Sequence, residues 1–154
     1  MLSLIACSLD ELKSEARVGE NTNTNKHTHA TLIVVPPALV AQWVSEVEKC
    51  CGDTLSVDVL DVNDNDFMKR NLVQPGGDGN DILVTTYSAL DNAKTSRYLA
   101  SWSWGRIVLD EQQEIRSSTT KIAKNCEGLD CHRRWMLSGR YSLGSLVHVS
   151  ILPT

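Results

Sequence analysis

Apolar residues in this chain come in short runs, and stretches with helical spacing separate the runs. The runs centre on 31–35, 82–86, 106–110 and 134–138. A short, nearly continuous apolar run predicts a strand that is buried on both faces. Residues 55–61 alternate between apolar and polar positions, which is typical of a further strand. Alternating strands and helices predict a mainly parallel sheet covered by helices on both faces.

The intervening stretches place apolar residues on one helical face. They predict helices over about 2–16, 38–51, 64–72, 94–104 and 117–125. Trp43 lies on the apolar face of its helix, which favours a core position over a ligand contact. Residues 19–29 are polar and low in complexity, and they predict an irregular loop. No linker divides the chain, so a single domain is expected.

Composition narrows the class of protein only slightly. The chain has 154 residues, 42% of them hydrophobic and 22% charged, as in an ordinary soluble domain. The net charge of -4 gives no global signature of nucleic-acid binding, and no apolar run approaches the roughly 20 residues that span a membrane. Five cysteines, two of them adjacent, favour a reducing intracellular compartment. Cys126, Cys131 and His132 lack a second cysteine pair, which disfavours a zinc site.

The most informative stretch is Arg106-Ile-Val-Leu-Asp-Glu-Gln-Gln113, in which a buried strand runs directly into two acidic residues. Ligands of open α/β sheets sit at the carboxyl ends of the strands. An aspartate there suits the water shell of Mg²⁺, and a neighbouring glutamate suits the alignment of an attacking water. The alternative is that the strand simply re-enters water at Asp110 and Glu111.

Four segments of this kind, each a mostly apolar run that ends in polar or turn-forming residues, follow one another along the chain. They are Thr31-Leu-Ile-Val-Val-Pro-Pro37 with Gln42-Trp43, then Asp81-Ile-Leu-Val-Thr-Thr-Tyr-Ser88, then Trp104-Gly-Arg-Ile-Val-Leu-Asp-Glu111, then Arg133-Arg-Trp-Met-Leu-Ser-Gly139. Their order and spacing resemble motifs Ia, Ib, II and III in the first RecA-like lobe of a Snf-type (Swi/Snf family) helicase-like ATPase of helicase superfamily two. The variant Asp-Glu-Gln-Gln resembles the ring-finger-containing, DNA-repair branch.

The resemblance implies a three-layer α/β fold of the RecA-like, P-loop NTPase type with a mainly parallel sheet. It implies ATP and Mg²⁺ as cofactors, with Asp110 holding the metal through water. Asp110 and Gln113 would then contact the nucleotide, and Glu111 would be the catalytic carboxylate.

Double-stranded DNA or chromatin is the partner that the resemblance implies, and the nucleus is the implied compartment. The implied activities are DNA repair and chromatin remodelling, and no membrane is involved. The residues expected to face DNA are Pro37, Gln42, Thr85, Thr86 and Tyr87. Thr85 and Thr86 are also good strand residues, which leaves a structural reading open. Ser138 and Gly139 would couple the nucleotide site to DNA tracking.

Two departures from the family pattern limit this expectation. No G-x-x-x-x-G-K-[ST] phosphate loop occurs among the 154 residues, and Arg140-Tyr141 follows Gly139 where the family continues with Thr-Pro. We therefore expect residues 1–139 to be a partial ATP-binding lobe, incomplete in fold, with a divergent tail at 140–154. We also expect the second RecA-like lobe to be missing, and we do not expect this chain alone to hydrolyse ATP. The alternatives are a non-catalytic DNA- or protein-interaction module, or a non-functional truncated gene product.

Overall fold

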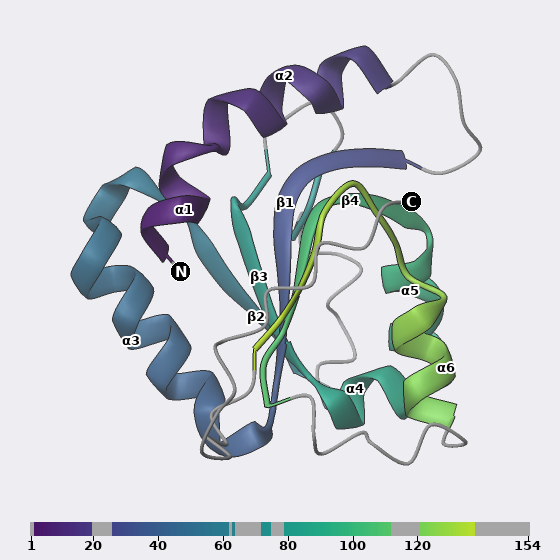
Figure 1. Ribbon diagram of the computed structural model, residues 1–154. Helices are drawn as coiled ribbons and strands as arrows, with labels where there is room; N and C mark the ends of the chain where they lie inside the picture. Colours follow the sequence, from purple (N-terminus) through teal and green to yellow (C-terminus); the bar gives the residue numbers. More distant parts are fainter. Residues whose placement is uncertain are drawn as a thin grey trace, which may run out of the picture.

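The structure is a computed structural model that describes residues 2–19, 26–61, 63, 72–74, 79–111 and 121–137. Helices, short 3-10 turns (η) and strands alternate along the chain (Figure 1). In chain order they are α1 Leu2–Cys7, α2 Leu9–Gly19, β1 Lys26–Val35, η1 Pro37–Leu39, α3 Val40–Cys51, η2 Gly52–Thr54, β2 Val57–Leu60, β3 Ile82–Thr86, α4 Tyr87–Asp91, α5 Ala93–Ala100, β4 Trp102–Leu109, α6 Lys121–Glu127, β5 Asp130–Cys131 and β6 Arg134–Met136.

The described strands form one six-stranded sheet in the order β2-β3-β1-β4-β5, with β6 also paired to β4. Every pair is parallel. β5 pairs with the start of β4, and β6 pairs with its end. The parallel sheet that the sequence predicted is therefore confirmed, and β1 and β4 lie at its centre.

Alternate side chains of each central strand supply two separate cores, one on each face of the sheet. Leu32 and Val34 of β1 join the core beneath α4, α5 and α6. Ile33 and Val35 join the core on the other face, with residues of α1 and α3. Figure 1 shows α1 and α3 on one side of the sheet and α4, α5 and α6 on the other, which is the expected three-layer arrangement.

β1 begins at Lys26, whereas the sequence predicted an irregular loop through residue 29. The prediction was wrong for 26–29, where two polar side chains, those of Thr28 and His29, have hydrogen-bond partners inside the fold. The Nε2 atom of His29 lies 3.0 Å from Oδ1 of Asp81. Thr28 Oγ1 accepts a hydrogen bond from the Ala30 N–H at a register shift in the strand. The early part of β1 pairs with the start of β4.

The helix predicted over 94–104 ends at Ala100 instead, and β4 starts at Trp102. Ser101 closes the helix, because its backbone N–H and its hydroxyl both donate to the Tyr98 carbonyl. Trp102 and Trp104 lie on one face of the strand, and both join the core under α5. Residues two apart share a face in a strand but not in a helix, so this spacing marks the start of the strand that the predicted helix ran past.

Other helices and strands begin or end a few residues from their predicted boundaries. The helix expected over 2–16 is two helices that break at Ser8, and the start of the helix expected at 38 is the 3-10 turn η1. The strand predicted at 134–138 is described as Arg134–Met136. The short elements α4 and β5 were not predicted. The predicted helix at 64–72 and the tail at 140–154 lie outside the described residues, apart from Leu72, which is in a bend.

Candidate functional site: an acidic turn at the carboxyl edge of the sheet

The parallel strands bring the carboxyl ends of β1, β2, β3, β4 and β6 to one edge of the sheet. Val35 is in register with Thr86, and Leu60 with Thr85. Leu109 is in register with both Val34 and Met136. The residues that follow these strand ends therefore share one edge, and this is the edge at which ligands bind to open α/β sheets.

Asp110 and Glu111 form a tight acidic turn at this edge, directly after β4. The Asp110 N–H donates to the Val34 carbonyl at 2.9 Å, which fixes the start of the turn to β1. The Glu111 N–H donates to Oδ1 of Asp110 at 2.9 Å. Glu111 has a φ of 51°, and it is the one non-glycine residue with positive φ in the described part of the chain. Such a conformation costs a side-chain-bearing residue about 1–3 kcal/mol and clusters at functional sites.

Two aromatic side chains reach the same turn from different helices. Trp43 of α3 donates from its indole Nε1 to Oδ2 of Asp110 at 2.8 Å. Tyr87 of α4 donates from its hydroxyl to the Asp110 carbonyl oxygen at 2.8 Å. Asp110 is therefore held through its carboxylate and through its backbone. The apolar spacing of the helix at 38–51 places Trp43 correctly against the core, but it carries no signal for the indole hydrogen bond.

The residues predicted to face DNA separate into two groups. Pro37 and Gln42 are exposed, and Thr86 is half-buried at the start of α4, where its hydroxyl accepts the Ala89 N–H. Thr85 is fully buried, and its hydroxyl donates to the Leu60 carbonyl at 2.9 Å. Tyr87 is also buried.

The hydroxyl groups of Thr85 and Tyr87 are thus engaged within the fold, so neither lies on a surface open to a DNA phosphate. The structural reading of Thr85, which the sequence left open, fits its burial. Gln113, Ser138 and Gly139, predicted for nucleotide contact and coupling, lie outside the described residues.

The donor set fits a magnesium ion held through water. Asp110 is half-buried, and each of its carboxylate oxygens accepts one N–H, which leaves lone pairs for water molecules. Mg²⁺ keeps several of its waters and uses one or two carboxylates, so the pair Asp110 and Glu111 suits it. Among the described residues, no group of three or more His, Cys, Asp or Glu side chains is arranged to hold a metal directly.

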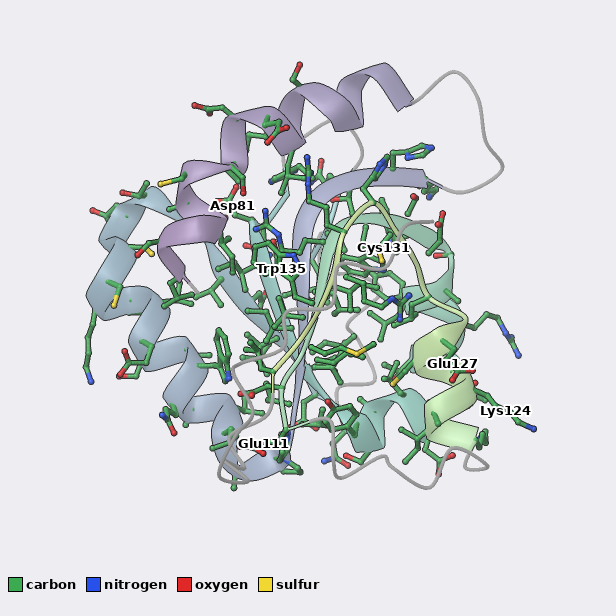
Figure 2. The ribbon with its side chains drawn as sticks, viewed as in Figure 1. Asp81, Glu111, Lys124, Glu127, Cys131 and Trp135 are labelled. Carbon is green, nitrogen blue, oxygen red and sulfur yellow. The ribbon has the colours of Figure 1, made fainter. Side chains whose placement is uncertain are left out.

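A second polar cluster lies at the other end of the sheet, where Asp81 is 52 residues away in sequence from its partner His29. Figure 2 shows Asp81 below α2 in the upper part of the view, well away from Glu111 near the bottom. The Asp81 carboxylate also accepts the N–H and the hydroxyl of Ser56, and it pairs with Lys13 at 3.1 Å. Burial raises the pKa of Asp81, but the hydrogen bonds from His29, Ser56 and Lys13 outweigh burial and hold this pKa well below 3.8. This cluster ties α2 to the sheet.

The comparisons agree with this architecture. Residues 1–140 match the family described as SNF2-related domain. The DNA repair protein RAD5B of Arabidopsis thaliana is 34% identical over 140 residues, which cover 82% of this chain and 11% of that protein. The DNA repair protein RAD5 of Candida albicans is 33% identical over 128 residues, which cover 73% of this chain and 12% of that protein.

A solved structure is also similar. The Sulfolobus solfataricus SWI2/SNF2 ATPase core in complex with dsDNA matches with a TM-score of 0.57 at 28% identity, over 84% of this chain and 24% of that chain. The parallel sheet between two helical layers, with an acidic turn at the end of a central strand, defines a RecA-like α/β domain. Within that class, the chain belongs to the SNF2-related domain family. It spans about a tenth of the length of the two relatives. No helix in the described part is long and apolar enough to cross a membrane.

Proposed function

We propose that this chain carries part of the N-terminal ATP-binding lobe of a DNA-dependent ATPase that acts in DNA repair or chromatin remodelling in the nucleus. One observation carries the proposal. The acidic turn of Asp110 and Glu111 shares the carboxyl edge of the sheet with the exposed residues Pro37 and Gln42 and with Thr86. A nucleotide site and a DNA-facing rim are therefore adjacent, as a motor that couples hydrolysis to DNA requires.

At the nucleotide side, Asp110 would hold Mg²⁺ through its water shell, and Glu111 would orient the attacking water. The metal, when bound, neutralises charge on the phosphates during phosphoryl transfer. Trp43 and Tyr87 keep Asp110 in place, so the carboxylate is already oriented before ligands arrive. Gln113 remains the proposed nucleotide contact, and Ser138 with Gly139 the proposed coupling segment.

At the DNA side, Pro37, Gln42 and Thr86 would contact the phosphate backbone. Contacts of this kind position a duplex without reading its sequence. The net charge of -4 agrees with a small local contact rather than a broad basic face. The similar Sulfolobus ATPase core was solved in complex with dsDNA, which supports the same class of partner.

The 154 residues contain no phosphate loop with its lysine, which in this type of ATPase grips the β- and γ-phosphates. Glu111 orients water productively only when a γ-phosphate is held before it. We therefore propose that this stretch by itself neither binds nucleotide measurably nor hydrolyses it. The alternative is a non-catalytic module that binds DNA or protein, and the following experiment distinguishes the two.

Calorimetric titration of the chain with Mg²⁺-ATP tests the nucleotide side. We expect no binding by the chain alone, and weak binding once a strand and a Gly-Lys-Thr loop are fused ahead of Met1. Binding by the unmodified chain, or binding by the fused protein that is indifferent to Asp110→Ala, would falsify the nucleotide role. Fluorescence anisotropy with a labelled DNA duplex tests the DNA side. Duplex binding by a fused protein that binds no nucleotide favours the non-catalytic module.

Gln42→Glu probes the rim directly. Placing a negative charge beside a phosphate costs about 1 kcal/mol, so we expect a loss of duplex affinity of roughly fivefold. The matched control is Ala100→Glu, which adds the same charge at the exposed end of α5. An equal loss in both variants would show that net charge, and not the rim at Gln42, governs binding.

A further inference from the structure

The acidic turn is held from both faces of the sheet at once. Trp43 packs against the core shared by α1 and α3, whereas Tyr87 belongs to the core beneath α4, α5 and α6. Their hydrogen bonds end on different atoms of Asp110, one on the carboxylate Oδ2 and one on the backbone carbonyl. The two contacts therefore restrain both the side chain and the main chain of the residue that precedes the strained Glu111.

Each of these aromatic residues is the sequence neighbour of a residue in the proposed DNA-facing rim. Gln42 is exposed and precedes Trp43 in α3, and Thr86 caps α4 just ahead of Tyr87. A helix moves as a rigid unit over one turn, so a shift at the exposed residue carries its neighbour with it. The path through Trp43 and the path through Tyr87 both end at Asp110. Each path therefore has a single residue between the rim and Asp110.

We propose that Trp43 and Tyr87 are positioning residues that hold the turn of Asp110 and Glu111 in its strained form and transmit a shift of the rim to it. The holding role stands on the hydrogen bonds alone. The transmitting role rests on the proposed function, because it requires DNA at the rim. Neither aromatic side chain would touch nucleotide or metal.

The positive φ of Glu111 gives the holding role its physical basis. A strained conformation persists only where the surroundings restrain it. The Glu111 N–H donates to the same carboxylate that Trp43 fixes, so freeing Asp110 also loosens the Glu111 backbone. If Trp43 served only as a packing residue, a phenylalanine in its place would leave this backbone unchanged.

Amide hydrogen exchange of Asp110 and Glu111, followed by NMR on the full chain, tests the holding role. Trp43→Phe removes the indole N–H and Tyr87→Phe removes the hydroxyl, and both keep an aromatic ring in the core. We expect exchange at Glu111 to rise roughly threefold to tenfold in each variant, as the loss of one hydrogen bond implies. The two changes are independent, so failure of one variant to fold leaves the other to decide.

Matched controls separate a local effect from a general loss of stability. Trp104→Phe removes an indole hydrogen bond of 3.0 Å to the Leu99 carbonyl, on the α5 side of the sheet. Tyr98→Phe removes a phenol hydroxyl from α5. Neither control should accelerate exchange at Glu111 beyond the change in global unfolding. Equal exchange at Glu111 in the test and control variants would overturn the proposal.

Titration with a DNA duplex tests the transmitting role in the same spectra. The Glu111 amide resonance of the wild-type chain should shift, and Trp43→Phe and Tyr87→Phe should shrink that shift by more than half while duplex affinity is kept. An unchanged shift in both variants refutes transmission. If the wild-type chain binds no duplex, the DNA part of the proposed function is wrong and transmission falls with it, whereas the exchange rates still decide the holding role.

Discussion

His29 and Asp81 form a buried polar pair at the amino-terminal end of the sheet, with 3.0 Å between Nε2 of the ring and Oδ1 of the carboxylate. The pair joins β1 to Asp81, the residue just before β3. Lys13 of α2 also pairs with Asp81 and so connects α2 to the sheet. Buried polar groups are stable only when they are hydrogen-bonded, and here the partners come from three distant parts of the chain. The interaction thereby fixes how α2 sits on the sheet.

Replacing Asp81 by asparagine should destabilise the fold at neutral pH. A hydrogen bond to a charged group contributes about 1.5–3 kcal/mol to stability, and asparagine recovers only part of this. The control is Asp53→Asn, at an exposed position in η2. Urea denaturation of both variants at pH 7 measures the difference, and equal free energies of unfolding would contradict the role assigned to Asp81.

The same residue predicts how stability depends on pH. Its pKa in the folded chain is lowered below 3.8, so its contribution is fully present above that value. The contribution is lost as the pH falls through the lower, folded pKa. The free energy of unfolding of the wild-type chain should therefore fall below about pH 4 more steeply than that of Asp81→Asn. If the free energies of unfolding of the two proteins fall equally steeply below about pH 4, the lowered pKa of Asp81 does not contribute to stability.

Glu111 should be a site where glycine stabilises the fold. Its φ of 51° is open to glycine at little cost and strained for other residues. Glu111→Gly and Glu111→Ala both remove the carboxylate, so their difference isolates the backbone. We expect the glycine variant to be the more stable by about 1 kcal/mol, the reverse of the usual order. Denaturant midpoints of the two variants measure this, and a more stable alanine variant would mean that the turn relaxes.

Gly105 should not accept alanine. A Cβ atom there would lie 2.6 Å from the carbonyl oxygen of His29 and 3.2 Å from Cδ2 of Leu12. The carbonyl belongs to β1, which is held between β3 and β4 and has little room to move. We expect a loss of about 1–3 kcal/mol in Gly105→Ala, as for other overpacked positions. Gly128→Ala is the control, because its nearest atom is the Lys124 carbonyl oxygen at 3.3 Å, and thermal unfolding compares them.

The fold was predictable where a strand is mostly apolar. Residues 31–35 and 82–86 form strands as expected, because a short, mostly apolar run is stabilised by burial on both faces of the sheet. The start of β1 was missed for the opposite reason. His29 is stable inside the sheet only because Asp81 meets it, and a contact across 52 residues leaves no trace in local composition.

The candidate site likewise has a part that the sequence predicted and a part that it did not. The acidic pair at the end of β4 was visible, since strand and carboxylates are adjacent in sequence. The support for it was not visible, because Trp43 and Tyr87 reach Asp110 from 67 and 23 residues away. Tyr87 was assigned to DNA, although its hydroxyl is directed inward. A buried tyrosine hydroxyl or tryptophan N–H usually has a hydrogen-bond partner within the fold. The hydroxyl of Tyr87 and the indole of Trp43 follow this rule at Asp110.

The cysteines should react in two classes. Burial raises the pKa of Cys126 to about 11, with Glu127 adding to the rise and Arg134 opposing it. Burial likewise raises the pKa of Cys131, whereas Cys7 and Cys50 are exposed.

At pH 8 only about one Cys126 thiol in a thousand is then a thiolate, the form that reacts. Iodoacetamide at pH 8, followed by peptide mass spectrometry, should label Cys50 well before Cys126. In urea the two rates should converge, because unfolding removes the burial that separates them. If Cys126 is labelled as fast as Cys50 in native buffer, α6 does not cover it in solution and the core beneath that helix is less closed than the structure indicates.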